Sequence, residues 1–316
     1  MSFLWIPGRG PDLSIIEDMC LRLPMPAEPM GEAWFMGNER KMFDELLDPN
    51  NFDEVEHCWE LRMRHSRALS EIASGRRFFG EFSEWRDWLH YLLPRVARAY
   101  ANIQPAILED PLELIVEAVV LHYPHDFTWA PYPGFREHIL ATLGRALMHG
   151  SRWSGGRVRP CMLLPHTCEQ CRFEEWYEPS HYLGAALFLH LKYLTPSELV
   201  PWTQSLLRIE DPHWRAQLMR WMTLARTTLL ASAHGNTPSE APEDRVWGAD
   251  SRSDEGAYEI PHANALAFAA TAADYFKKIS PVDWWVSMAD YPYLDLSTWD
   301  IIERFESHYA PSSRSP

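Results

Sequence analysis

Apolar residues recur at three- and four-residue steps along most of this sequence, which is the spacing of a helix with one buried face. In Phe52–Ala73 the apolar positions follow this spacing, and Ser74-Gly75 then signals a helix end. A second helical segment follows Ser83, which we expect to be its N-cap, and Pro94 inside it predicts a kink or a break. Both segments are predicted to be α-helices.

Four further helices are predicted from a short polar residue that precedes proline and an apolar helical pattern. The pairs are Asp110-Pro111, Thr195-Pro196, Asp211-Pro212 and Ser280-Pro281. The polar side chain can accept a backbone N–H bond as N-cap, and proline fits the first helical position, where its missing N–H costs nothing. Glu198, three residues after Thr195, also matches the capping-box pattern.

Strand signals are weak by comparison. Residues 155–164 (GGRVRPCMLL) could hold a short strand or a hairpin arm, and no longer alternating pattern occurs. The sequence therefore predicts an all-α fold, an irregular multi-helix array or bundle with almost no β-sheet. A stack of HEAT-like helical pairs fits the pattern equally well, although no period can be demonstrated.

The pattern also predicts how the chain is organised. Residues 1–38 are expected to form an irregular Pro/Met-rich arm packed on the fold, with a short helix near Leu13–Leu21. Residues 39–234 are expected to form the main helical domain, and the helices of 260–310 to pack on the same domain. Residues 235–259 are acidic and almost without apolar positions, which predicts a flexible loop, either a linker or a lid.

The net charge of the chain favours some classes of binding partner over others. The chain has 29 basic and 44 acidic residues and a net charge of −15, which disfavours nucleic-acid binding because phosphate contacts dominate that affinity. A basic protein partner would be attracted instead. The 15 tryptophans are interpreted as aromatic core filler, with an aromatic-lined groove as the alternative.

The longest apolar runs, such as LIVEAVVL, are too short to span a membrane. The N-terminal residues MSFLWIPGRG have no basic region ahead of their short apolar run, so we expect no secretion signal and a cytoplasmic protein.

The sequence CMLLPHTCEQC contains the one concentrated group of metal-binding side chains: Cys161, His166, Cys168 and Cys171. A C-x2-C turn can place two thiolates on one tetrahedral ion, which predicts a structural zinc site completed by the other two residues. Reduced thiols without metal are slightly favoured over this zinc site, and a Cys168/Cys171 redox pair is the third alternative. The redox pair is disfavoured because no βαβ context surrounds it.

His122, His125 and Asp126 close a predicted helix and could bind a metal ion or perform acid–base chemistry. The simpler interpretation is a helix end favoured by the histidine and stopped by Pro124. No G-x-S-x-G, H-E-x-x-H or phosphate-binding loop motif occurs in the sequence.

Together these features favour a non-enzymatic, acidic, α-helical protein-interaction module, one version of which would neutralise a basic partner such as a toxin. The alternative is a helical enzyme or small-ligand-binding protein with an aromatic pocket and the His/Asp group as its site. Oligomeric state is not predicted by any feature of the sequence.

Overall fold

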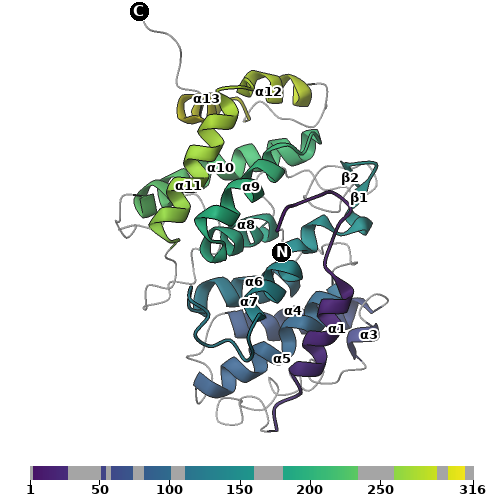
Figure 1. The fold of residues 1–316 in the computed structure, drawn as a ribbon. Helices are drawn as coiled ribbons and strands as arrows, with labels where there is room; N and C mark the ends of the chain where they lie inside the picture. The colour runs from purple at the N-terminus through teal and green to yellow at the C-terminus, as the bar shows by residue number, and fades with distance from the viewer. Residues whose placement is uncertain are drawn as a thin grey trace, which may run out of the picture. The chain divides into compact units, whose positions relative to one another are not determined.

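Helical periodicity along the sequence translates directly into the architecture of the computed structural model, which describes residues 3–27, 51–54, 58–73, 82–100, 111–159, 181–233, 260–289 and 298–309. Within these ranges the chain forms twelve α-helices and one two-stranded hairpin (Figure 1). The predicted all-α multi-helix array with almost no sheet is therefore confirmed. The chain divides into two compact units, and the first holds the described residues from Arg9 to His149. The domain boundaries expected from the sequence stay predictions.

The first unit is built from six helices among its described residues. They are α1 (Leu13–Arg22), α3 (Asn51–Glu54), α4 (Trp59–Ala73), α5 (Phe82–Tyr100), α6 (Pro111–His122) and α7 (Phe135–Ala141). A 3-10 helix follows at Leu143–Met148. Helix α6 packs against both α4 and α5, which explains why its sequence LIVEAVVL is apolar on nearly every side. Helix α5 also packs against α1, the short helix expected near Leu13–Leu21.

Two predicted helix boundaries in this unit need correction. The single helix expected over Phe52–Ala73 is two helices, α3 and α4, and Cys58 lies outside both. Helix α5 begins at Phe82 rather than after Ser83, and the centroid of the Phe82 ring lies 4.3 Å from that of Trp129. Differences of one or two residues are common at helix ends.

Pro94 does not split α5, which runs unbroken from Phe82 to Tyr100. A proline inside a helix removes one backbone hydrogen bond and costs about 3 kcal/mol. The apolar face of α5 offsets this cost, since Trp85, Trp88 and Leu92 on it are fully buried.

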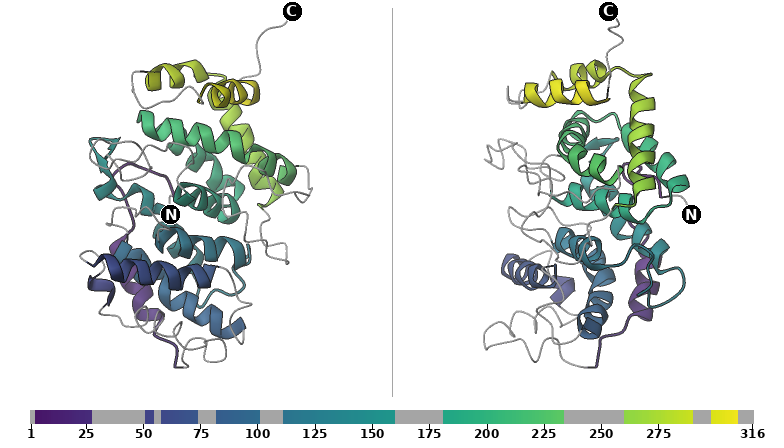
Figure 2. Two further views of the ribbon diagram at one scale, coloured as in Figure 1. Left: turned by 180° about the vertical axis from the view of Figure 1, so that it is seen from behind. Right: turned by 90° about the vertical axis from the view of Figure 1, so that its left-hand side faces the viewer.

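The second unit holds residues 3–8 together with the described residues after His149. Its elements are a 3-10 turn (Gly150–Arg152), β1 (Trp153–Ser154), β2 (Arg157–Val158), α8 (His181–Tyr193), α9 (Pro196–Leu207), α10 (Pro212–Ala233), α11 (His262–Phe276), α12 (Pro281–Ala289) and α13 (Thr298–Tyr309). Helix α11 packs against α8, α9 and α10, while α10 also contacts α12 and α13. Figure 2 shows α11 standing steeply across the direction of α10.

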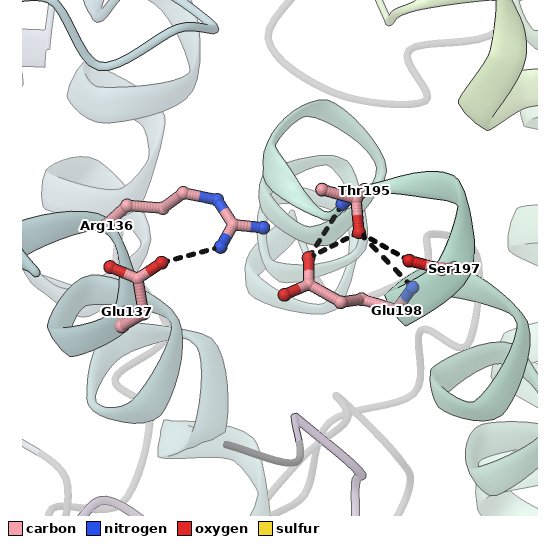
Figure 3. Close-up of polar contacts among 5 residues, drawn as sticks. All are labelled: Arg136, Glu137, Thr195, Ser197 and Glu198. Carbon is pink, nitrogen blue, oxygen red and sulfur yellow. Dashed lines mark hydrogen bonds and ion pairs between the residues drawn. The ribbon is translucent and has the colours of Figure 1, made fainter.

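All four prolines that were predicted to start helices do so. Helices α6, α9, α10 and α12 begin at Pro111, Pro196, Pro212 and Pro281. The capping box of α9 is complete, because the Glu198 backbone N–H donates to Thr195 Oγ1 and the Thr195 backbone N–H donates to Glu198 Oε2 at 2.8 Å (Figure 3). At α10 the Trp214 backbone N–H donates to Asp211 Oδ1 at 2.8 Å, so Asp211 is the cap that the sequence predicted.

A hairpin overlaps the segment 155–164, which was expected to hold a short strand or a hairpin arm and of which residues 160–164 lie outside the described residues. Strands β1 and β2 pair antiparallel around Gly155 and Gly156, whose φ angles are 57° and 79°. Positive φ at both central residues is the requirement of a two-residue type I′ turn, which glycine meets without steric cost.

Tryptophans fill the interior of the second unit. The Trp5 ring lies 5.1 Å from the ring of His190, 5.4 Å from that of Trp202 and 5.6 Å from that of Trp214, each in an edge-to-face arrangement. His190 in turn stacks parallel on Trp202. All four side chains are buried. The interpretation of these tryptophans as core filler is therefore confirmed.

Candidate interaction surface

Helix α1 is fixed to the first unit by one of its faces. The N-cap Asp12 accepts hydrogen bonds from the backbone N–H and the hydroxyl of Ser14, at 3.0 Å and 2.6 Å. These bonds hold the pKa of the Asp12 carboxyl below its usual value. Ile16 and Met19 are fully buried on the side where α1 packs against α5 and α7.

The C-terminal end of α1 is held by a single arginine of α5. The guanidinium of Arg95 donates from Nη1 to the carbonyl of Leu23 at 3.1 Å and from Nη2 to the carbonyl of Cys20 at 3.4 Å. The same guanidinium lies 3.7 Å from the centroid of the Tyr91 ring. Since the last carbonyls of a helix lack intrahelical partners, this arginine both satisfies them and fixes where α1 ends on α5.

The opposite face of α1 is exposed and partly apolar. Leu13 is 57% exposed and Leu21 is 84% exposed, and Met25 just beyond the helix is 43% exposed. Glu17 lies between the two leucines at four-residue spacing and is also exposed. Residues at i, i+4 and i+8 follow one line along a helix. We call Leu13, Glu17 and Leu21 the outer face of α1.

Charges of both signs surround the outer face, because exposed Arg9 and Arg22 lie near its carboxylates. Asp12 and Glu17 are exposed carboxylates, while Asp18 is paired with Arg22 at 2.7 Å. The Arg22 guanidinium also lies 5.0 Å from the centroid of the ring of Tyr132, a residue that precedes α7 in the chain. The outer face therefore combines exposed apolar side chains with the exposed carboxylate of Glu17, while the Asp12 carboxylate interacts with Arg145.

A second exposed apolar face occurs on α12 in the second unit. Val282 is 44% exposed and Val286 is 55% exposed, while Trp284 on the other side is fully buried against Phe276 at 5.1 Å. Exposed Lys278 lies four residues before Val282, as exposed Arg9 lies four residues before Leu13, and exposed Asp283 lies on α12. Each face therefore combines exposed apolar side chains with charges of both signs.

The cysteine cluster predicted to bind zinc cannot be placed. Cys161, His166, Cys168 and Cys171 lie outside the described residues, so the structural zinc site stays a prediction. Across the described ranges, no group of three or more His, Cys, Asp or Glu side chains is arranged to hold a metal ion.

The candidate site at the end of α6 consists of His122, His125 and Asp126, and two of these side chains form hydrogen bonds with the backbone. The imidazole of His122 contacts the carbonyl oxygen of Ala73 at 2.9 Å, and its ring lies edge-on to Trp85. Asp126 Oδ1 accepts the backbone N–H of Thr128 at 3.1 Å, which lowers the pKa of this carboxyl. His125 is exposed beside it. These contacts support the simpler interpretation, in which the group ends the helix and turns the chain.

Sequence reasoning missed a buried histidine–tyrosine pair in the first unit. The Nε2 atom of His90 lies 3.1 Å from the hydroxyl of Tyr123, and both rings pack against Phe135. Burial lowers the pKa of His90 to about 4 and raises that of Tyr123 above its usual value. Phe127, which also packs on Tyr123, has a φ of 54°, an unusual value for a bulky residue. No local motif marks this pair, because α5 and the turn after α6 meet only in the fold.

Sequence reasoning also missed the outer face of α1. The signal was available, since Leu13–Leu21 has apolar residues on two faces, and a helix with two apolar faces needs two partners.

Within the part of the chain that the structure describes, no helix is long and apolar enough to cross a membrane. No family model, no curated protein and no solved structure matches this chain.

Proposed function

We propose that this protein is a non-enzymatic interaction module that captures a basic protein partner. The observation that carries the proposal is the combination of a net charge of −15 with apolar side chains exposed among carboxylates on α1. An acidic field attracts a basic partner and raises its rate of association, while apolar contacts slow its dissociation. A small basic toxin is one partner of this kind.

The alternative function, a helical enzyme or small-ligand-binding protein, would use His122, His125 and Asp126. Two of these three side chains have partners in the backbone, as described above. A thermal-shift screen against metabolites tests this alternative, since a metabolite that binds the native state must raise its melting temperature.

The experiment begins with capture of partners by the immobilised full-length chain at low salt. Each partner is then purified, and its dissociation constant is measured at about 50 mM and about 300 mM salt, because exposed charges are screened over this range. We expect a partner with an excess of Lys and Arg and a dissociation constant that rises at least about tenfold with salt. An acidic partner, a constant that ignores salt, or a large melting-temperature shift with a metabolite and no protein partner would contradict the proposal.

A further inference from the structure

Residues 3–8, which we call the N-terminal arm, belong to the second unit, while the chain from Arg9 to His149 belongs to the first. Residues 3–6 of the arm lie outside any helix or strand. Burial alternates along them, since Phe3 and Trp5 are 4% and 1% exposed while Ile6 is 36% exposed. This alternation is typical of an extended segment that turns every second side chain toward a surface. The arm therefore lies on the second unit as an extended peptide would.

The side chains that receive Trp5 come from the three helices α8, α9 and α10. We call them the Trp5 site: His190, Trp202, Ser205 and Trp214. The Trp5 ring lies edge-on to all three aromatic rings, and the Trp5 backbone N–H donates to Ser205 Oγ at 2.9 Å. The site thus contacts both an aromatic side chain and the backbone N–H of the same residue.

The residues of the Trp5 site are also held by contacts that do not involve the arm. The His190 ring stacks on Trp202 at 4.8 Å, and the Ser205 hydroxyl donates to the Trp202 carbonyl at 2.7 Å. The indole N–H of Trp214 donates to the carbonyl of Leu206 at 3.0 Å. Because the Ser205 proton points to its own helix, the hydroxyl oxygen is left to accept an N–H from outside. The site is therefore preformed, and we expect it to keep its shape without the arm.

We propose that the Trp5 site docks an extended apolar segment of a partner chain with aromatic residues two positions apart, and that the N-terminal arm is its intramolecular competitor. Phe3 and Trp5 define the pattern that the partner must match. A short tether gives the arm an effective concentration on the order of mM, so a partner binds only as far as it displaces the arm. The proposal goes beyond the proposed function, because neither the net charge nor α1 enters it.

The probe is a fluorescent peptide with the sequence of residues 2–8, SFLWIPG, blocked at both ends. Binding to the full-length chain is measured by fluorescence anisotropy. Trp5→Ala in the chain disables the competitor and should strengthen peptide binding at least about tenfold over the wild type, because a site that is free one-tenth of the time loses that factor in affinity. A control peptide with alanine in place of its tryptophan should bind neither chain.

A second substitution tests the hydrogen bond to the peptide backbone. Ser205→Ala, added to Trp5→Ala, removes the acceptor and should weaken peptide binding roughly fivefold. Ser287→Ala is the matched control, since the Ser287 hydroxyl also donates to a carbonyl three residues earlier, that of Trp284. In the same Trp5→Ala chain it should leave binding within about twofold. Equal effects of the two serine substitutions would overturn the assigned site.

A peptide could also adhere to any chain whose core has lost a tryptophan. Trp85→Ala removes a fully buried tryptophan of α5 in the first unit and tests this. It should not bind the peptide. Equal binding to the Trp5→Ala and Trp85→Ala chains, or equal binding of the alanine peptide, would overturn the proposal.

Cleavage of the arm provides a test that leaves every side chain of the Trp5 site and of the arm unchanged. A protease site is inserted between Gly8 and Arg9, and the folded chain is cut there. We expect the cut arm to exchange with the labelled peptide while the helical circular dichroism signal is retained. An arm that excess peptide cannot displace, or one that leaves only as the helices unfold, would show that the arm is an integral part of the core and would overturn the proposal.

The oligomeric state decides whether another molecule of this protein is the occupant. A wild-type dimer that becomes monomeric with Trp5→Ala would show that two copies exchange arms, and it would overturn the assignment of the site to a different chain. A monomeric wild type that binds the peptide as expected would support that assignment.

Discussion

His90 is a histidine that the fold keeps neutral. It lies on the buried side of α5, where desolvation lowers its pKa to about 4, and the charges of Arg86 and Asp87 act on it in opposite directions. The Tyr123 hydroxyl and the Phe135 ring occupy the space around the imidazole. Protonation of His90 therefore destabilises the folded state of the first unit.

This residue predicts acid sensitivity of the first unit. Because the pKa of His90 is lower in the folded state than in the unfolded state, its contribution to stability is complete above about pH 6.5 and is lost as the pH falls toward 4. The loss should reach up to about 3 kcal/mol of unfolding free energy. Urea unfolding at pH 7 and pH 4.5 should show a smaller difference for His90→Gln than for the wild type. The exposed His262 provides a control, and an equal effect of His262→Gln would refute this assignment.

Lys192 in α8 shows the same physics, since its charged form is also a cation that burial disfavours. Its side chain is buried, and desolvation lowers its pKa to about 7, although the amine lies 5.2 Å from the centroid of the Tyr193 ring. Folding must therefore either release a proton from this amine or hold its charge in the interior.

Replacement by methionine should stabilise the protein near neutral pH. The lowered folded-state pKa means that the cost of Lys192 is largest at and below about pH 7 and declines as the pH rises toward 10.5. Lys192→Met should raise the unfolding free energy at pH 7 by roughly 2–3 kcal/mol, and this gain should shrink at pH 10. Thermal melts at both pH values measure this, with the exposed Lys278→Met as control. A gain that is the same at both pH values would show that packing rather than charge is responsible.

At the scale of the element, local sequence rules account for most helix starts. The capping box of α9 is the clearest example, since two reciprocal hydrogen bonds join Thr195 and Glu198. A third hydrogen bond, which the Thr195 hydroxyl donates to Glu198 Oε2 at 2.9 Å, joins the same two residues. Because these bonds are local, their contribution can be measured with little change in packing.

Thr195→Ala should lower the unfolding free energy of the second unit by about 1 kcal/mol, because the Glu198 backbone N–H loses the hydroxyl oxygen of Thr195 as an acceptor. Thr195→Ser retains the hydroxyl and should cost less than half as much. Chemical denaturation of both variants provides the measurement. Equal losses for alanine and serine would indicate that the methyl group, rather than the cap, matters.

At the scale of the whole molecule, the division into two units predicts two cooperative regions. Trp202 is fully buried and joins Trp5 and His190 inside the second unit. Trp202→Ala should cost about 3–5 kcal/mol through the cavity that it leaves. Hydrogen exchange should then accelerate in α8, α9 and α11 while α5 and α6 keep their protection. Uniform acceleration across the chain would show that the molecule unfolds as one cooperative system.

The sequence by itself determined the fold class and most helix starts, because helical periodicity and N-caps are local and need only neighbouring residues. It also determined the net charge of −15, and through it the class of partner that the protein is expected to attract. The sequence did not show that α5 would remain continuous at Pro94. The packing that offsets the cost of this proline comes from other helices.

Tertiary structure alone decided which polar and apolar groups are buried. His90 meets Tyr123 across 33 residues of chain, and Arg95 reaches the end of α1 across 72. It also decided that Ile16 and Met19 turn inward, which leaves Leu13 and Leu21 outside. Periodicity shows that a helix has apolar faces, but only packing against α5 and α7 determines which of them remains available to a partner.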